Sequence, residues 1–211
     1  MLRTMNGTIT LRPAHPDDAP AIAPLLVMAG GGSYEFMLDG LVPGMSTEEL
    51  LLPGLAGTTG SFSHRHIVVA ETADGTVAGI AHAYPTDWMR KADRSQIPPD
   101  RLEHLVSFDA VQDWDTLFLS ALAVVPAWRR QGVAGRLLEN TVERAAVGGF
   151  PGLSLHVWAD NGPAHRLYAR HGFAERGRAA IPWHPRLPHE GGSILMVRET
   201  LTRRTGFPLW R

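Results

Sequence analysis

An almost unbroken apolar run at residues 117–125 constrains this chain more than any other segment. The run reads LFLSALAVV, and Ser120 is its only polar residue. It is too short to cross a bilayer, and its residues lack the spacing of an amphipathic helix. Such a run is typical of an inner β-strand that other elements cover on both faces. The run therefore predicts a central strand in a layered fold.

The glycine-rich start of a helix is expected directly after this strand. Pro126 ends the strand, because proline cannot donate a ladder hydrogen bond. The first N–H groups of a helix opening over residues 131–135 have no partner within the helix and carry the positive end of its dipole. Gly132 and Gly135 leave this backbone open to a ligand. Three nearby side chains add positive charge: Arg129, Arg130 and Arg136. We expect an anion site that fits a phosphate.

Short strands and helices account for most of the remaining chain. Further strands are expected at residues 8–12, 67–71, 76–84, 153–158, 173–178 and 193–199. Helices are expected at residues 17–28, 34–39, 47–55, 99–108, 131–147 and 162–171. The Asp74-Gly75 pair predicts a hairpin, and the helix after Arg130 forms the one strand–helix–strand crossover. We predict an α+β (mixed α/β) fold whose mixed sheet of about seven strands carries helices on both faces.

Length and charge limit the classes of protein that this chain can belong to. The 211 residues suffice for one well-buried domain, which we expect over residues 1–199, with an insertion at about 85–115 and a tail at 200–211. The net charge is −1 and the basic residues are spread out, which argues against a nucleic-acid partner.

The absence of cysteine and of long apolar segments narrows the choice further. A chain without cysteine has no disulfide, no thiolate zinc site and no cysteine nucleophile. No apolar run reaches the length of a membrane span, and the first residues lack the apolar core of a signal peptide. We expect a soluble cytoplasmic protein with no membrane partner. A nucleotide-binding P-loop or dinucleotide fold is excluded, because neither of their glycine signatures occurs.

Two segments together resemble the GNAT superfamily of acyl-CoA-dependent N-acyltransferases. Residues 129–134 read RRQGVA and fit the family's acyl-CoA signature: Arg or Gln, two residues, Gly, one residue, then Gly or Ala. Residues 155–161 read LHVWADN and, with Ala164, Leu167, Tyr168, Gly172 and Phe173, resemble the family's second motif. The resemblance covers about residues 8–199, and residues 85–115 depart from the common pattern.

The resemblance implies acetyl-CoA as co-substrate, and we expect no metal. The pyrophosphate would bind the N–H groups of residues 131–135, and the pantetheine arm would pair with the central strand where it splays from the strand at 153–158. The implied cofactor-binding residues are Leu122, Ala123, Val124, Arg129, Arg130, Gln131, Gly132, Val133, Ala134, Gly135 and Asn161.

The resemblance also implies a reaction: acetyl transfer to a primary amine of a small molecule or peptide, by direct attack in a ternary complex. Tyr168 would lie near the thioester sulfur and donate to the leaving thiolate, because phenol and thiol pKa values differ by only about 1.5. Four residues are candidates for a base: Asp115, His156, Glu35 and Glu103. The rival hypothesis is a non-catalytic acyl-CoA-binding or regulatory module. Family members often dimerise, so the resemblance allows a homodimer.

Each predicted site residue also has a plain structural interpretation. Gly132 and Gly135 suit a tight turn that binds nothing, and Arg129 suits a solvated surface. Asn161 before Gly162-Pro163 is good helix-capping chemistry. Tyr168 lies at helical spacing on an apolar face, where a packed core tyrosine is expected. His156 is better interpreted as a strand residue with a satisfied hydrogen bond than as a base.

The acceptor is where the sequence is least informative. We expect acceptor walls from residues 34–55, 85–114 and 183–189, with Trp88, Met89 and Trp114 either covering the cleft or simply packing. Four acidic residues could attract a cationic amine: Glu35, Asp39, Glu48 and Glu103. A metal site at His64, His66, His184 and His189 is disfavoured for want of a convergent carboxylate.

Overall fold

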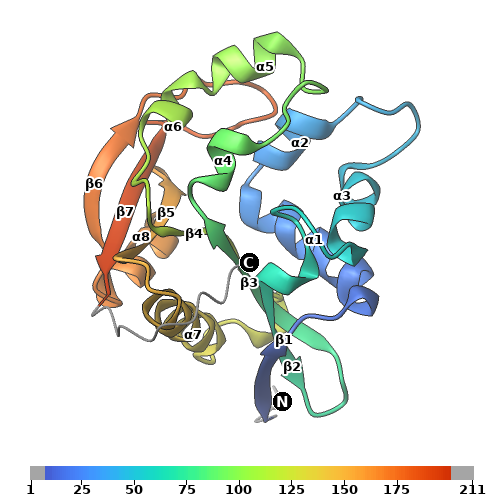
Figure 1. Ribbon diagram of the computed structural model, residues 1–211, viewed down its shortest axis with the longest axis vertical. Coiled ribbons are helices and arrows are strands. Elements are labelled where there is room, and N and C mark those ends of the chain that lie inside the picture. The colour runs from blue at the N-terminus through green and yellow to red at the C-terminus, as the bar shows by residue number, and fades with distance from the viewer. Residues whose placement is uncertain (1–7, 201–211) are drawn as a thin grey trace, which may run out of the picture.

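A seven-stranded mixed sheet organises the computed structural model, which describes residues 8–200 (Figure 1). The strands are β1 (Ile9–Pro13), β2 (Ile67–Thr72), β3 (Val77–Pro85), β4 (Leu117–Val124), β5 (Gly152–Trp158), β6 (Ala174–Ala179) and β7 (Ser193–Glu199). Their order is β1-β2-β3-β4-β5-β7-β6, and only β4 and β5 are parallel neighbours. The predicted mixed sheet is therefore confirmed, with the hairpin at Asp74-Gly75 joining antiparallel β2 and β3.

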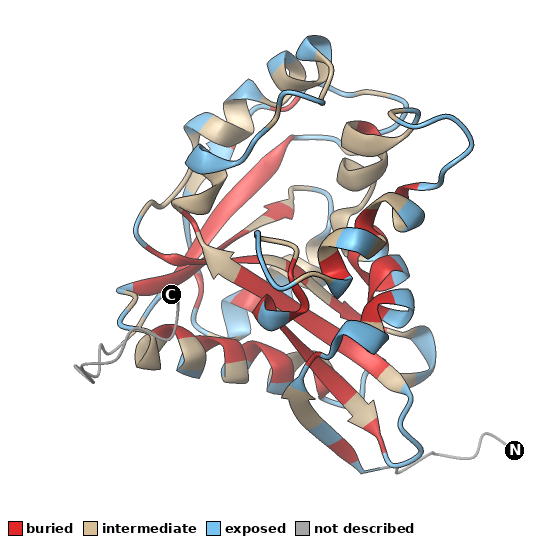
Figure 2. Cartoon of the chain, turned by 45° about the vertical axis from the view of Figure 1, so that its right-hand side comes forward, coloured by how far each residue is buried: buried red, intermediate tan, exposed pale blue. Residues whose placement is uncertain are grey.

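Helices cover both faces of this sheet. They are α1 (Ala19–Gly30), α2 (Ser33–Leu38), α3 (Thr47–Ala56), α4 (Trp88–Lys91), α5 (Pro99–His104), α6 (Val106–Ala110), α7 (Val133–Val147) and α8 (Gly162–Arg170). Buried apolar side chains of α1 and α3 pack on one face, and those of α7 on the other. Figure 2 shows the resulting burial of the central strands. No helix within residues 8–200 is long and apolar enough to cross a membrane.

The first turn of α7 differs from the prediction. The helix begins at Val133 and not at Gln131, because the backbone reverses just before it. Arg130 and Gly132 both have positive φ, 60° and 80°, a conformation that glycine adopts without the steric cost that a side chain adds. The N–H groups at the start of α7 therefore directly follow a tight left-handed turn at residues 130–132.

The insertion forms two short helices where one was predicted at residues 99–108. The chain leaves helical geometry at Leu105, so α5 ends and α6 starts again in a new direction. Arg101 holds α5 against α2, because its guanidinium donates to the carbonyl oxygens of Met37 (3.0 Å) and Asp39 (2.9 Å) at the end of α2. The segment thus bridges α2 and the β6 side of the sheet (Figure 1).

Strands β4 and β5 separate soon after they pair. Their ladder joins only Leu117 to Leu153 and Phe118 to Ser154. On the other edge of β4, Ser120 is the extra residue of a bulge opposite β3, which bends the strand. From Leu119 onward the β5-facing edge of β4 has no strand partner, which leaves backbone hydrogen-bonding groups for a ligand.

The domain boundaries stay a prediction. All seven strands belong to one sheet, which fits a single domain over residues 1–199. Thr200 still hydrogen-bonds to the carbonyl oxygen of Pro151 (3.0 Å). Residues 1–7 and 201–211, which include nearly all of the predicted tail, lie outside the described part of the chain.

Candidate active site

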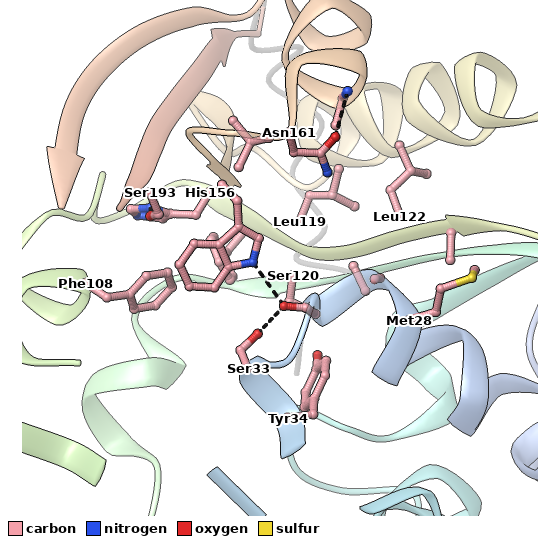
Figure 3. Close-up of a pocket in the computed structure, with 18 of the residues that line it drawn as sticks. Met28, Ser33, Tyr34, Phe108, Leu119, Ser120, Leu122, His156, Asn161 and Ser193 are labelled. Carbon is pink, nitrogen blue, oxygen red and sulfur yellow. Dashed lines mark hydrogen bonds between the residues drawn. The ribbon is translucent and has the colours of Figure 1, made fainter. Parts of the chain in front are cut away.

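One cavity of about 930 Å³ opens where β4 and β5 separate. Its walls come from α1 and α2, from the inserted helices α4–α6, from β4 and β5, and from the first turns of α7 and α8. Figure 3 shows Asn161 and Leu122 on one side of this space and Tyr34 and Ser33 on the opposite side. The cavity is large enough for a cofactor arm and a second substrate.

Nearly all of the predicted site residues meet in this cavity. The residues that line it are Leu122, Ala123, Val124, Arg129, Arg130, Gly132, Val133, Ala134, Gly135, Asn161 and Tyr168. Gln131 is the exception, since its side chain turns back and donates to the carbonyl oxygen of Ala127 (2.9 Å). The chain therefore brings together, from β4, α7 and α8, residues that lie up to 46 positions apart (168 − 122).

The start of α7 is open to an anion. A Cβ atom at Gly132 would meet no atom outside the neighbouring residues within 4 Å, so the space beside this backbone is open. Arg129 is anchored and not merely solvated, because its Nε donates to the carbonyl oxygen of Val124 (3.0 Å). A free helix N-terminus beside an anchored guanidinium suits a pyrophosphate.

Asn161 caps α8 and also lines the cavity. Its Oδ1 accepts a hydrogen bond from the N–H of Ala164 (3.2 Å), which confirms the helix-capping interpretation. The residue also lines the cavity, and Figure 3 shows its side-chain nitrogen directed away from the cap. Capping fixes the amide orientation, so the nitrogen is held ready to donate to a ligand carbonyl.

Tyr168 is a buried residue at the edge of the cavity. Its ring packs against Phe173 with centroids 5.8 Å apart, as the packing interpretation expects. Burial raises the pKa of its hydroxyl to about 12, well above the value near 10 assumed from the sequence. Complete proton transfer to a thiolate is therefore less favourable than predicted, and hydrogen-bond donation to the sulfur is the better description of what this group can do.

His156 is not available as a base. Its Nε2 lies 2.8 Å from the carbonyl oxygen of Val111, which can only accept, so this nitrogen carries the proton. Its Nδ1 then accepts from the hydroxyl of Ser193 at 2.5 Å. Burial lowers the pKa of His156 to about 4, so the ring is neutral at pH 7. This confirms the interpretation of His156 as a satisfied strand residue.

The other three base candidates lie away from the cavity. Asp115, Glu35 and Glu103 are absent from its lining. Of the acidic residues expected to attract an amine, Asp39 instead pairs with Arg186 (3.3 Å), and Glu48 sits in the first turn of α3, which does not line the cavity. Sequence position alone does not specify which carboxylates of the acceptor segments line the cavity.

Two expected acceptor walls also differ from the prediction. Neither α3 nor the loop at residues 183–189 lines the cavity. The loop instead supports the turn between α1 and α2: His189 Nε2 lies 2.8 Å from the carbonyl oxygen of Gly31. Its ring stacks on Trp158 at 4.3 Å, and Trp158 in turn donates to the carbonyl oxygen of Gly30 (3.2 Å). The loop therefore supports the α1–α2 wall of the cavity without lining the cavity itself.

In the insertion, Trp88 and Met89 line the cavity, as expected of a cover. Trp114 does not, and the guanidinium of Arg90 lies 3.8 Å from its ring centroid. Sequence reasoning missed Ser120, which lines the cavity, and its hydrogen-bond partner His82, which is fully buried. The available signal was their position, since each interrupts an otherwise apolar inner strand.

The histidines considered for a metal are dispersed. His64 contacts the carbonyl oxygen of Leu55, and His184 packs against Phe36. Within residues 8–200 there is no group of three or more histidine, cysteine, aspartate or glutamate side chains that could hold a metal ion.

Comparisons with known proteins agree on one family. The model of the acetyltransferase (GNAT) family matches residues 58–173, more than half of the chain. A 57-residue segment is 44% identical to a mycothiol acetyltransferase of Brachybacterium faecium; it spans 27% of this chain and only 17% of that relative's length.

Solved structures extend the likeness to the whole fold. A structure described as an acetyltransferase has a TM-score of 0.66 and 25% identity, covering 90% of this chain and 99% of its own. An N-acetyltransferase from Staphylococcus aureus Mu50 has a TM-score of 0.66 at 21% identity, covering 90% and 100% of the two chains.

Proposed function

The chain belongs to the GNAT acetyltransferase family, and from this membership we propose that it transfers an acetyl group from acetyl-CoA to a primary amine of a small molecule or peptide. One observation carries the proposal. The unpaired edge of β4, the open start of α7 and the hydroxyl-bearing Tyr168 all face one cavity. These are the groups that a peptide-like arm, a pyrophosphate and a leaving thiolate require.

Binding follows from the free groups of the backbone. We propose that the pyrophosphate is held by the N–H groups at the start of α7, with Arg129 and Arg130 beside it. The amides of the arm pair with β4 at Leu122 and Val124, and Asn161 donates to the arm from the opposite side. A strand edge that lacks a partner is well suited to such pairing.

The reaction is a direct displacement in a ternary complex. The lone pair of the neutral amine attacks the thioester carbonyl carbon, the C–N bond forms and the C–S bond breaks. The electron pair of the broken bond stays on sulfur, one amine proton leaves nitrogen, and sulfur gains a proton, so the products are an amide and free CoA. Tyr168 donates a hydrogen bond to the sulfur as its charge develops.

Tyr168→Phe is expected to lower kcat by about 10- to 100-fold and to leave the Kd for CoA unchanged. The ring packing against Phe173 is kept, and only the hydroxyl is removed. Single-turnover kinetics with calorimetry of CoA binding check this. Equal turnover by the variant would reduce Tyr168 to a packing residue.

Mixing the protein with acetyl-CoA and a panel of primary amines is expected to release free CoA thiol at a rate that depends on the amine. The non-catalytic alternative predicts acetyl-CoA binding by calorimetry with no thiol release above background for any amine. The two measurements together therefore decide between an enzyme and a binding module.

A further inference from the structure

A directed chain of hydrogen bonds ends at the bulge of β4. His82 Nε2 lies 2.7 Å from the carbonyl oxygen of Ser61, which can only accept, so this nitrogen carries the ring proton. His82 Nδ1, 2.6 Å from Ser120 Oγ, must then accept the serine proton. The Ser120 hydroxyl has therefore committed its only proton to His82, and its oxygen can only accept a further hydrogen bond.

This serine lies at the cavity, where its lone pair is accessible to a substrate. Ser120 is partly exposed and lines the cavity beside Leu119, where β4 loses its partner. Figure 3 places Ser120 between Tyr34 on one side and His156 on the other. An amine N–H is the kind of group that such an oxygen binds.

Rings cover the sheet face around this point. His82, Tyr84, Phe118 and His156 follow one another across β3, β4 and β5, with successive centroid distances of 5.3, 5.7 and 6.4 Å. Both imidazoles are neutral at pH 7, because burial lowers each pKa to about 4. These four side chains, which we call the ring row, therefore form an uncharged and largely apolar surface.

The inserted helices supply the opposite wall. No residue of α4, α5 or α6 is buried, although several are large and apolar. Those that line the cavity are Trp88, Met89, Leu102 and Phe108, together with Leu105 between α5 and α6. Apolar side chains that face a cavity and not the core gain their burial only when a ligand fills that space.

The carboxylates beside the inserted helices are already engaged in hydrogen bonds. Among residues 8–200, the carboxylates that line the cavity are Asp93 and Asp109. Asp109 is engaged by Arg94 through a bidentate ion pair, and Asp93 is exposed and bonded to the N–H of Ser95. Neither offers an enclosed partner for a second positive charge, which a polyamine or an amino sugar would bring.

We propose, building on the acetyltransfer function above, that the acceptor is a primary amine carried on an apolar, ring-sized group, with its nitrogen donating to Ser120 and its ring between the ring row and the inserted helices. The chemistry is shared by an arylalkylamine and by a peptide whose first residue is aromatic, so both are tested.

The test measures thiol release with two matched pairs of acceptors. 2-Phenylethylamine is compared with 1,4-diaminobutane, which replaces the ring by a second cation, and Phe-Gly-Gly is compared with Asp-Gly-Gly. The ring-bearing member of at least one pair is expected to have a kcat/KM at least about 100-fold higher. The pair that responds identifies the source of the amine.

Variants test the placement within the cavity. Ser120→Ala is expected to raise KM for the preferred amine about 10-fold with little change in Kd for CoA, and Ser120→Thr is expected to restore it. Ser154→Ala is the matched control: Ser154 is fully buried, hydrogen-bonds to Thr116 at 2.7 Å and does not line the cavity. Met89→Asp is expected to lower kcat/KM for the ring-bearing amine. The ratio of that kcat/KM to the value for its matched acceptor, the diamine or Asp-Gly-Gly, should therefore decrease.

The outcomes distinguish a failure of the acceptor assignment from a failure of the proposed acetyltransfer function. Release of thiol with the diamine or Asp-Gly-Gly but not with either ring-bearing acceptor overturns the acceptor assignment and leaves acetyltransfer standing. No release with any amine, while CoA still binds, rejects both. An equal KM increase in Ser120→Ala and Ser154→Ala removes Ser120 from the contact with the acceptor.

Discussion

Gly132→Val is expected to weaken acetyl-CoA binding at least about 100-fold, the loss of one or two hydrogen bonds to a charged group. The side chain would enter the open space beside the first N–H groups of α7, where we place the pyrophosphate. It would also strain a backbone whose φ is 80°. Isothermal titration calorimetry with CoA measures the first effect, and the melting temperature measures the second.

Two further variants distinguish the effect of filling the phosphate site from the effect of straining the backbone. Gly132→Asn has a side chain of similar size that tolerates positive φ better than valine does. Gly149→Val introduces the same residue just after the other end of α7, where φ is 78° and a Cβ again meets nothing within 4 Å. We expect CoA binding to be lost in both Gly132 variants and kept in Gly149→Val. Unchanged affinity in Gly132→Val would sink the assignment of the phosphate site.

Acidification from pH 7 to pH 4 is expected to destabilise the protein by several kcal/mol. Burial lowers the pKa of both His82 and His156 to about 4, against 6.5 for an unburied histidine. Between pH 6.5 and pH 4 the unfolded chain therefore binds protons at these two histidines, and the folded chain does not. The stability contributed by the neutral rings is complete above pH 6.5 and is lost as pH falls toward 4, at about 3 kcal/mol for each histidine. This is a large part of the stability of a typical domain.

Urea unfolding at pH 7.0, 5.5 and 4.5 measures the loss. His156→Gln, which cannot titrate, is expected to be less stable at pH 7 and to lose less stability between pH 7 and 4.5 than the parent chain. The imidazole NMR signals of both histidines are expected to stay those of neutral rings down to about pH 5. A signal that titrates near pH 6.5 would contradict the buried, hydrogen-bonded state of that ring.

Local patterns predicted most elements to within a few residues. Alternation, apolar runs and glycine breaks are properties of neighbouring residues, so they located β4, the β2–β3 hairpin and the amphipathic α7. The errors lie at the ends and breaks of elements. Helix α7 begins at Val133, after the positive φ of Gly132. The predicted helix at residues 99–108 divides at Leu105, and Arg101 of its first half is bonded to the end of α2, some 60 residues earlier in the chain.

The proposed donor site could be predicted from the sequence by itself, because a helix start, a glycine and a strand edge would bind acetyl-CoA mainly through backbone groups of neighbouring segments. The proposed acceptor contacts came only from the tertiary structure. Ser120 and His82 lie 38 residues apart and meet across β3 and β4, and Tyr34 and Phe108 face them from two further elements. Whether a polar residue donates, accepts or is already satisfied depends on those partners. The same fact removed His156 as a base, since both its nitrogens are occupied by Val111 and Ser193.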